Sequence, residues 1–362
     1  MSDRLVEVAI FGGNGFIGRY LLRALLRSTS AQEPNQLRIR VISRDAVKAR
    51  IGLANDLDPS LKKAIQSNQI AFTSADITRY EQVQQALRPQ PHSVTNLVGL
   101  LYETPPNRTF ERVHVKGAEN IARALLESGR SETDASGQAE PPIMTQVSAI
   151  GADFTARHSA YARTKGLAEQ TLLSQLGKQL VILRPSIVFG PGDQFFTRFR
   201  DMARFSPVLP LIGSGMTRFQ PVHVEDLALA IARCTIPAER HKYMSIESNT
   251  EPSMDREHEQ IYEIGGRDML TFRELMERML TATRMRRVLL PVPLSIASFQ
   301  AQMAETVHRI FPGIPPLLTR DQIALLERDN IVHPGYRGLH ELGIAQPRGV
   351  DAQSLAYLCE RN

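Results

Sequence analysis

The chain of 362 residues is long enough for two domains, or for one large α/β domain with an appendage, and either can bury a substantial core. A hydrophobic content of 42% and a charged content of 22% are typical of a soluble globular protein and exclude an intrinsically disordered chain. The 43 basic and 38 acidic residues give a net charge of +5, which is too small to indicate a nucleic-acid-binding protein.

The two cysteines, Cys234 and Cys359, lie far apart and outside any Cys/His cluster. They predict neither a disulfide framework nor a metal site, and they favour a reducing compartment. The opening segment "MSDRLVEVAIFGG" lacks the features of a secretory signal or a mitochondrial presequence. No run approaches the roughly 18 apolar residues that cross a bilayer, so we expect any membrane association to be peripheral.

The first predicted element is a buried parallel strand, "VEVAIFG" at residues 6–12, and a helix follows it directly. Ile17, Leu21 and Leu25 recur at helical spacing and form one apolar face of that helix. Between the two elements, the segment "GGNGFIG" has glycines at positions 12, 15 and 18. The order of strand, glycine turn and helix is the first feature that indicates a function.

A helix N-terminus offers unpaired backbone N–H groups and a favourable dipole to a diphosphate, but side chains would block the approach. Gly12 permits a tight turn, Gly15 lets a pyrophosphate come close, and Gly18 lets the helix pack on the strand. The segment predicts a dinucleotide site rather than an ordinary tight turn, although its spacing is GxxGxxG instead of GxGxxG. The expected contacts are Gly12, Gly13, Asn14, Gly15, Phe16, Ile17 and Gly18.

The second predicted strand, "LRIRVIS" at 37–43, ends where an acidic residue would bind a ribose 2′-hydroxyl and a basic one a 2′-phosphate. Arg44 stands there, which favours NADP(H) over NAD(H); the alternative is a solvated charge at the strand end. Asp45 behind it is a predicted N-cap for the next helix. After a third strand at 70–77, Asp76 is predicted either to meet the adenine or to cap a helix.

Strands alternate with helices along the first half of the chain. Further strands are predicted at 94–101, at 143–150 and within 180–193, and helices are predicted near 46–51, 80–87 and 111–127. This alternation indicates a parallel, doubly wound α/β sheet with right-handed crossovers.

The predicted domain division follows from where that alternation ends. We expect a nucleotide-binding domain at 1–190, completed by a strand and a helix from about 215–236, and a smaller, mostly helical region at 191–362. Polar segments at 129–142 and 237–260 are predicted surface insertions. The motifs "TFRE" (271–274) and "TRDQ" (319–322) fit capping boxes and predict helix starts.

Tyr161 and Lys165 in "YARTK" are four residues apart, which places both on one face of a helix. There the ammonium can lower the pKa of the phenol and hold a nicotinamide ribose, and such a tyrosine serves as a general acid or base in hydride transfer. The alternative is an ion pair between Lys165 and Glu169, with Tyr161 merely packing.

From the glycine turn onward, the chain resembles the extended and atypical short-chain dehydrogenase/reductases, which are related to nucleotide-sugar epimerases and dehydratases. The matching stretches are "GGNGFIG", "ADI", "VHVKGAENI", "YARTK", "LRPSIVFGPGD", "QPVHVEDLA" and "YEIGG". The resemblance implies a Rossmann-type fold with a smaller substrate-like region. It also implies cofactor contacts at the strand ends, from Asp76, Ile77, Leu97, Val98, Gly99, Pro185 and Ile187.

Within that family, the chain is most similar to the nucleotide-binding accessory subunits of respiratory complex I. The stretches that carry this similarity are 96–103, 147–153, 195–213 and 318–332. The resemblance implies a firmly held reduced dinucleotide, association with subunits of the peripheral arm, and a role in assembly or stability. The implied location is the cytoplasmic face of a bacterial inner membrane, or the matrix side in a mitochondrion.

One departure from the family bears on catalysis. Active extended members carry a Ser or Thr hydroxyl shortly after the fifth strand, where this chain has Ile150, and Ser148 lies upstream. The spacing from Ser148 to Tyr161 is shorter than the family usually shows. Ser148, Tyr161 and Lys165 are therefore expected to form a catalytic set only if the chain is active; otherwise Ser148 is a cofactor-side or structural hydroxyl.

A basic cluster and an apolar stripe follow one another near the C-terminus. Arg284, Arg286 and Arg287 precede apolar residues at helical spacing, namely Ile296, Phe299, Met303, Val307 and Ile310. Such a pair of features can dock on a partner or on a membrane surface. The favoured interpretation is that the stripe covers the domain's own core.

Two functions from different classes are consistent with the sequence. The first is a non-catalytic, NADPH-binding accessory subunit of complex I, favoured by Ile150 and by the similarity through residue 332. The second is an active NADP-dependent reductase or a sugar-nucleotide epimerase or dehydratase that uses Tyr161 and Lys165.

Overall fold

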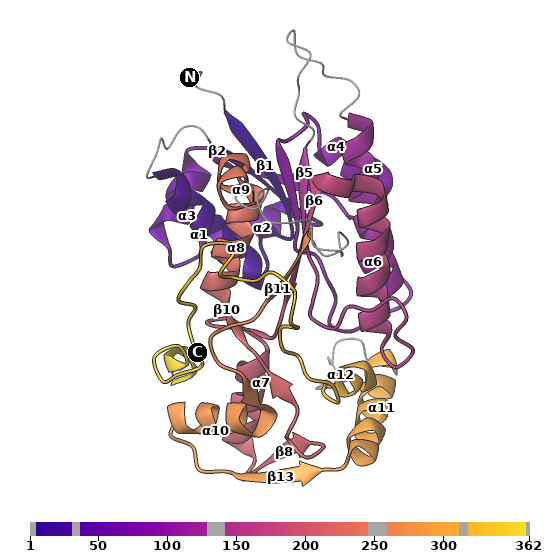
Figure 1. The fold of residues 1–362 in the computed structure, drawn as a ribbon, viewed down its shortest axis with the longest axis vertical. Coiled ribbons are helices and arrows are strands. Elements are labelled where there is room, and N and C mark those ends of the chain that lie inside the picture. The colour runs from indigo at the N-terminus through magenta and orange to yellow at the C-terminus, as the bar shows by residue number, and fades with distance from the viewer. Residues whose placement is uncertain (1–4, 31–36, 129–141, 245–258, 311–317, 360–362) are drawn as a thin grey trace.

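A seven-stranded sheet forms the centre of the computed structural model, which describes residues 5–30, 37–128, 142–244, 259–310 and 318–359 (Figure 1). The strand order is β11-β6-β5-β4-β1-β2-β3, and all six pairings are parallel. The predicted doubly wound sheet is confirmed. Its strands are β1 (Val6–Phe11), β2 (Leu37–Ser43), β3 (Ile70–Ser74), β4 (Ser93–Asn96), β5 (Ile143–Val147), β6 (Leu180–Pro185) and β11 (Ile261–Ile264).

Helices cover both faces of this sheet (Figure 1). One face carries α1 (Phe16–Ser30) and α8 (Val224–Thr235), whose apolar side chains share a buried cluster with β1 and β2. The other carries α4 (Tyr80–Ala86), α5 (Gly117–Ser128) and α6 (Ala160–Leu176) around a second cluster. Two short helices, α2 (Ala46–Ala54) and α3 (Pro59–Gln66), connect β2 to β3.

The strands end earlier than the sequence predicts. In the predicted strand 94–101, β4 stops at Asn96, whose side-chain oxygen accepts from the backbone N–H of Val98. Residues 97–101 are therefore a loop at the carboxyl end of the sheet. The predicted strands 70–77 and 143–150 likewise end at Ser74 and Val147. The predicted helix at 111–127 begins as a π-helical segment, Glu111–Lys116, and continues as α5.

Two elements beyond residue 190 pack with the central sheet. Helix α8 lies on one face, and β11 pairs with β6 at the sheet edge. The strand before α8, β10 (Val222–His223), pairs with β7 (Val188–Phe189) outside the main sheet. Helix α9 (Pro237–Met244) occupies the start of the polar segment 237–260, while 245–258 and 129–141 lie outside the described residues. The domain boundary near 190 stays a prediction.

The C-terminal region has its own core of aromatic, leucine and methionine side chains, among them Phe196, Phe199, Phe272 and Met276. Both predicted capping boxes are present, from Thr271 to Glu274 and from Thr319 to Gln322. The elements are α7 (Phe195–Phe205), β8 (Val208–Ile212), β9 (Arg218–Phe219), β12 (Leu270–Thr271), α10 (Phe272–Ala282), β13 (Val288–Val292), α11 (Leu294–Ile310), α12 (Arg320–Leu325) and a 3-10 turn, Ala356–Cys359.

Helix α11 departs from the favoured interpretation of its sequence. The residues that it buries are Ala297, Ala301 and His308, whereas Phe299 is 65% exposed and Met303 is 54% exposed. The apolar stripe therefore faces outward, and the prediction that it covers the domain's own core is wrong. Ile310, the last residue of the predicted stripe, ends α11, and its side chain lies outside the described residues.

Candidate functional site

The glycine turn connects β1 to α1 at the point where the sheet reverses its strand order, between β1 and β4. In open α/β sheets this is where ligands bind. Gly12 has φ of +79°, which favours glycine, and its carbonyl accepts from the N–H of Gly15. A Cβ on Gly18 would lie 2.5 Å from the backbone of Gly13, so close packing excludes any side chain there.

The start of α1 has the backbone arrangement expected for the turn. Gly13 and Asn14 lie in the turn itself, while Phe16, Ile17 and Gly18 form the first residues of the helix. A Cβ on Gly15 would meet only the Gly12 carbonyl oxygen, at 3.2 Å, so the protein itself leaves room beside Gly15. A side chain there would instead fill the space above the turn.

The loop after β4 lies beside this turn. A Cβ on Gly12 would lie 3.2 Å from the Val98 side chain, and the N–H of Leu97 donates to the carbonyl of Phe11 at the end of β1. A Cβ on Gly99 would lie 3.4 Å from Lys165 Nζ. The fold therefore gathers the glycine turn, residues 97–99 and Lys165 at one edge of the sheet.

Ser148 follows β5 and has a buried hydroxyl that makes no hydrogen bond with the described residues. A buried polar atom without a partner is unfavourable, so it indicates a place where a ligand group fits. The position where a hydroxyl is expected is occupied by Ile150, whose side chain is apolar and buried. The backbone N–H of Ile150 donates to the carbonyl of Pro185. Ile187 follows β6 and accepts from the N–H of Val222.

Arg44 follows β2, is exposed, and pairs with no carboxylate among the described residues. The nearby arginines of α1 differ, because Arg19 and Arg23 both bind Asp56. Asp45 caps α2 by accepting from the N–H of Lys48 at 2.8 Å, which confirms its predicted role. Arg44 is thus a guanidinium held at a strand end without an internal partner.

Asp76 does not cap a helix, since the N-cap residue of α4 is Arg79. Its carboxylate accepts from the N–H and the hydroxyl of Thr78, at 2.9 and 2.8 Å, and closes a local turn. Ile77 is buried, and a Cβ on Gly117 would lie 2.5 Å from its Cδ1 atom. The structure therefore places Asp76 and Ile77 in a turn after β3.

Tyr161 and Lys165 share a face of α6, as their spacing predicts, but their electrostatics differ from the prediction. Desolvation, and then the negative charge of Asp321, raise the pKa of Tyr161 to about 12. Burial lowers the pKa of Lys165 to about 8, opposed by Glu169. Lys165 Nζ lies 5.9 Å from the centre of the Tyr161 ring and donates to the carbonyl of Val147. The ammonium therefore makes a hydrogen bond with the backbone here, whereas its contact with Tyr161 is with the ring.

The alternative ion pair between Lys165 and Glu169 is also wrong. The carboxylate of Glu169 is bound by Arg184 from β6, with nitrogen to oxygen distances of 2.5 to 3.2 Å. Lys165 therefore remains directed at the edge of the sheet where the glycine turn lies.

Asp321, which sequence reasoning missed, ties α12 to the start of α6. Its carboxylate accepts from the backbone N–H groups of Ala160 and Tyr161, at 2.6 and 3.2 Å, and from the Ser159 hydroxyl. The neighbouring Gln322 donates to the carbonyl of Leu101, in the loop after β4. The signal was the capping box that begins α12, but its partner lies far away along the chain.

His308 of α11 contacts the same loop. Its Nε2 atom lies 3.4 Å from the Thr104 hydroxyl, and its ring packs edge-on against Tyr102. Helices α11 and α12 thus lie against residues 101–104, next to Tyr161.

His114 is a second residue that sequence reasoning missed, although it lies in the quoted stretch "VHVKGAENI". Its Nε2 accepts from the N–H of Leu100, and its Nδ1 lies 3.0 Å from the Thr164 hydroxyl. Burial, and then the charge of Lys165, hold the pKa of His114 well below its usual range. A neutral ring with the proton on Nδ1 satisfies both contacts, so His114 positions the loop after β4.

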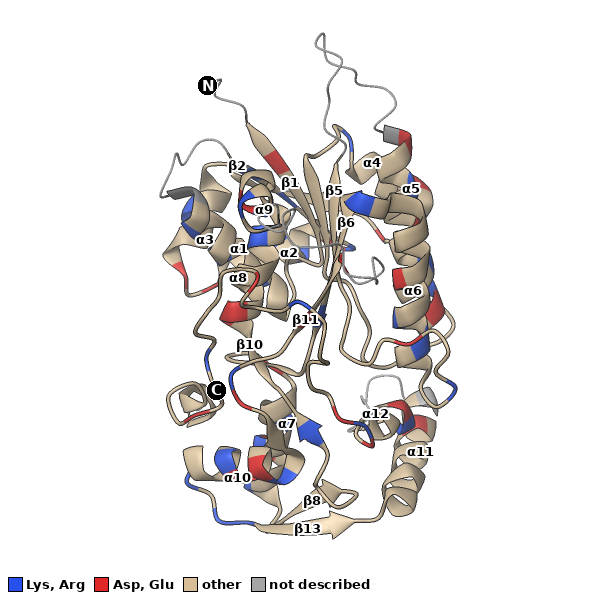
Figure 2. Cartoon of the chain, in the orientation of Figure 1, with Lys and Arg blue, Asp and Glu red and all other residues tan. Residues whose placement is uncertain are grey.

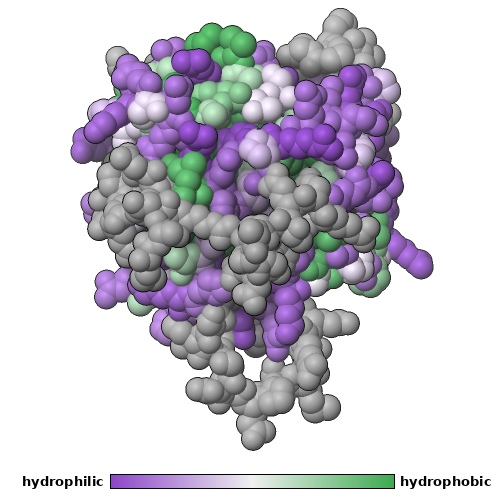
Figure 3. Space-filling model, turned by 90° about the horizontal axis from the view of Figure 1, so that it is seen from above, coloured by the Kyte–Doolittle hydropathy of each residue, from purple (hydrophilic) through white to green (hydrophobic). Residues whose placement is uncertain are grey.

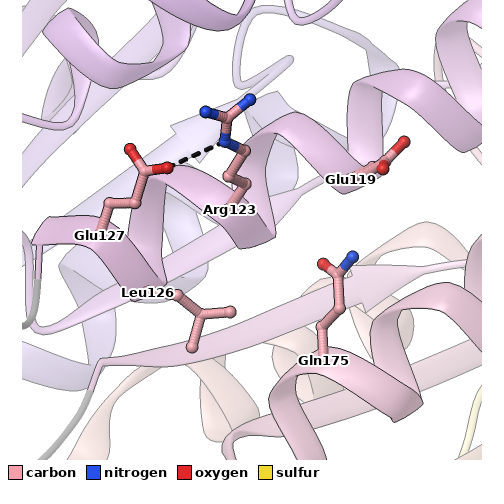
Figure 4. A pocket seen from close by; sticks show the side chains of 5 residues that line it. All are labelled: Glu119, Arg123, Leu126, Glu127 and Gln175. Atoms are coloured by element: carbon pink, nitrogen blue, oxygen red, sulfur yellow. Dashed lines mark hydrogen bonds and ion pairs between the residues drawn. The ribbon is translucent and has the colours of Figure 1, made fainter.

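The hollow in Figure 4, about 330 Å³ in volume, lies between α5 and α6 and contains none of the predicted site residues. It is lined by Glu119, Arg123, Leu126, Glu127 and Gln175, and Arg123 pairs with Glu127 one turn further along α5. Within the described ranges, no cluster of three or more His, Cys, Asp or Glu side chains has the arrangement of a metal site. None of the described helices has the length and apolarity to span a membrane.

Residues 8–239 match the family model described as "NAD dependent epimerase/dehydratase family". The chain is 29% identical over 333 residues to "NADH dehydrogenase [ubiquinone] 1 alpha subcomplex subunit 9, mitochondrial" of Arabidopsis thaliana, covering 90% of this chain and 71% of that protein. It is 24% identical over 352 residues to "NADH-ubiquinone oxidoreductase 40 kDa subunit, mitochondrial" of Neurospora crassa, covering 96% and 78%.

Among solved structures, the chain is similar to an NADPH-dependent quinone oxidoreductase from Escherichia coli complexed with NADPH. The TM-score is 0.63 at 16% identity, and the match covers 98% of this chain and 100% of that one. At this identity the likeness supports the fold.

Proposed function

The chain belongs to the NAD dependent epimerase/dehydratase family, and from this premise we propose that it is a non-catalytic, NADP(H)-binding accessory subunit of respiratory complex I. The relatives named as subunits of NADH dehydrogenase or NADH-ubiquinone oxidoreductase support this assignment, since they match 90% and 96% of the chain. The proposed partners are subunits of the peripheral arm. The proposed location is the cytoplasmic face of a bacterial inner membrane, or the matrix side in a mitochondrion.

The residues at the edge of the sheet fit a dinucleotide. In this proposal, a pyrophosphate lies beside Gly15 at the N-terminus of α1, and Lys165, which is close to Gly99, holds the nicotinamide ribose. Arg44 lacks an internal partner and suits the 2′-phosphate of NADP(H), while the buried Ser148 hydroxyl would gain a hydrogen bond. A nicotinamide supplies hydride chemistry when it is bound, but in this proposal the nucleotide serves as a stabilising ligand.

The contact of Asp321 with α6 is the main support for proposing that the chain is non-catalytic. A tyrosine acting as a general acid or base near neutral pH needs a pKa close to the working pH. The carboxylate of Asp321 instead accepts from the N–H of Tyr161, and its charge adds to desolvation in raising the pKa of the phenol to about 12. Ile150 supplies no hydroxyl beside it.

The alternative is an active NADP-dependent reductase, epimerase or dehydratase. The observation in its favour is that Tyr161 and Lys165 are both present on one face of α6, with Lys165 beside Gly99.

Purification from membranes in mild detergent tests the subunit assignment. A tagged chain should comigrate with NADH:quinone oxidoreductase activity through a sizing step, and released protein should carry NADP(H). A chain that migrates alone, with the respiratory activity elsewhere, would overturn the assignment.

A pair of variants separates the two functions. Tyr161→Phe should leave assembly and quinone reductase activity nearly unchanged, because only a hydroxyl is lost. Lys165→Ala should lower the nucleotide content and the thermal stability together, because a ligand that binds the folded state stabilises it. An enzyme would show the opposite order, with turnover of its substrate falling about 10²- to 10⁴-fold in Tyr161→Phe.

A further inference from the structure

Helix α11 presents an apolar face with no covering element among the described residues. Its exposed large side chains recur at three- and four-residue spacing and are Ile296, Phe299, Met303 and Val307. The opposite face is buried through small residues, Ala297 and Ala301, which let the helix lie close to the C-terminal core. No unpaired acidic side chain lies on this helix, because Glu305 is its one acidic residue and it binds Arg320.

Further exposed apolar side chains lie on β13, the strand before α11. Val288 and Leu290, two residues apart, are both more than half exposed. Strand β13 pairs with β8 in a two-stranded sheet, and β8 follows Phe205, which is 90% exposed at the end of α7. We call these residues of α11, β13 and the end of α7 the distal apolar surface; in Figure 1, β13 and α11 lie at the end of the molecule away from the N-terminus.

A basic segment borders the distal apolar surface. Arg284 and Arg286 are exposed, and neither pairs with a described carboxylate, while Arg287 is anchored by donating to the carbonyl of Ala203. Together with Arg273, which pairs with Glu277 in the same lining, these arginines line a hollow of about 710 Å³ between α10 and β13. Figure 2 shows this basic segment beside β13. The opposite end of the molecule, in Figure 3, presents mainly hydrophilic side chains where residues are described.

We propose that the distal apolar surface is a membrane-docking site, on which an anionic lipid bilayer is the partner. Apolar side chains flanked by arginines are the arrangement of proteins that lie in the interface, with the apolar part among the acyl chains and the guanidinium groups on lipid phosphates. The proposal deepens the membrane location proposed above and rests on it for the choice of membrane.

Charge argues against a second copy of the chain as the partner. A symmetric contact through this surface would bring the same patch from both copies together, and with it the unpaired Arg284 and Arg286 of each. Anionic phosphates, in contrast, complement these arginines directly. A protein partner would need acidic groups beside an apolar groove, and it is an outcome of the experiment below.

Flotation of the purified full chain with vesicles tests the proposal without any other subunit present. The chain should float with vesicles of phosphatidylcholine and phosphatidylglycerol, and binding should weaken at high salt and on phosphatidylcholine alone. The double variant Arg284→Glu, Arg286→Glu should lose at least about tenfold in binding, since each basic residue near an anionic surface contributes about fivefold. The double variant Phe299→Ser, Met303→Ser should lose binding to a similar extent.

A matched control removes exposed apolar side chains from elsewhere. Ile51 and Leu57, near α2, are 56% and 96% exposed, so Ile51→Ser, Leu57→Ser should float like the unmodified chain. Unchanged melting temperatures establish that each variant is folded. The proposal would be overturned if the Phe299/Met303 variant and the control bound equally. It would also be overturned if the chain floated equally with vesicles that contain phosphatidylglycerol and with vesicles of phosphatidylcholine alone.

The vesicle result is independent of the complex I assignment. A chain that floats but does not comigrate with NADH:quinone oxidoreductase activity would overturn the subunit assignment and leave the docking site. A chain that comigrates but binds no vesicles would place a protein partner on the distal apolar surface.

Discussion

Helices α1 and α11 are both amphipathic, yet they turn opposite kinds of side chain toward the core. In α1 the large residues Leu21, Leu22 and Leu25 are fully buried against the central sheet. In α11 the buried residues are alanines, and Phe299 and Met303 point outward. The periodicity of apolar residues locates a stripe on a helix, but the packing partners decide whether that stripe lies inside.

The difference has a physical cause in what each helix meets. Helix α1 spans a wide sheet and α8, which together offer enough apolar surface to bury leucines. Helix α11 lies at the edge of a smaller core, and it approaches closely through Ala297 and Ala301. The sequence does contain a signal for this packing. Two alanines four residues apart, opposite a stripe of large residues, indicate that α11 packs through the face with the small side chains.

The comparison predicts its largest effect in a pair of truncations. Leu22→Ala in α1 should lower the free energy of unfolding by about 2–5 kcal/mol, because it leaves a cavity in a fully buried cluster. Phe299→Ala in α11 should change it by less than about 0.5 kcal/mol. Denaturant unfolding of both variants measures this, and a large loss in Phe299→Ala would mean that α11 buries its stripe after all.

The glycine turn gives the next effect and separates packing from ligand access. Gly18→Ala should cost at least about 2 kcal/mol of stability without nucleotide, since its Cβ would lie 2.5 Å from backbone atoms of Gly13. Gly15→Ala should fold normally but lose more than about tenfold in nucleotide affinity, because its Cβ enters the space proposed for the pyrophosphate. Thermal unfolding and nucleotide titration distinguish the two; full affinity in Gly15→Ala would contradict the phosphate site.

Asp321 connects α12, in the C-terminal region, to the start of α6, on the central sheet. Its removal should have an effect of intermediate size. Asp321→Ala deletes three hydrogen bonds at the start of α6 and should cost about 1–2 kcal/mol, as the loss of a helix cap does. The pKa of Tyr161 should then fall from about 12, because one of the two causes that raise it is gone. Ultraviolet titration of the phenol, with Tyr161→Phe as the blank, measures the shift. An unchanged pKa would remove Asp321 from the account of Tyr161.

Arg44 gives the smallest expected effect and sharpens the assignment of the nucleotide. Arg44→Ala should weaken NADP(H) about tenfold, or about 1.4 kcal/mol, and leave NAD(H) nearly unchanged, since the guanidinium acts on the 2′-phosphate. Calorimetric titration with both nucleotides is the measurement. Equal weakening of the two would make Arg44 a general electrostatic or structural contact.

The sequence predicts the first region well because its signals are local. The strand before Gly12, the helix after Gly15 and the cap at Asp45 each depend on residues within a few positions. The contacts that complete the site are different: Asp321 reaches α6 across 160 residues, and His114 fixes the loop at Leu100. No local pattern specifies such contacts, and the pKa of Tyr161 depends on one of them.

The contacts of α11 and α12 with the loop after β4 have a thermodynamic consequence. Asp321 and Gln322 of α12, with His308 of α11, all contact residues 101–104 or the start of α6, while exposed residues of α11 form part of the distal apolar surface. Two ligands are coupled when binding of one changes the affinity for the other, and coupling of this kind is reciprocal. If a bound nucleotide raises the affinity of the chain for a bilayer, the bilayer must raise the affinity for the nucleotide by the same factor. The fraction of chains with nucleotide at the sheet edge would then report whether the chain is at the membrane.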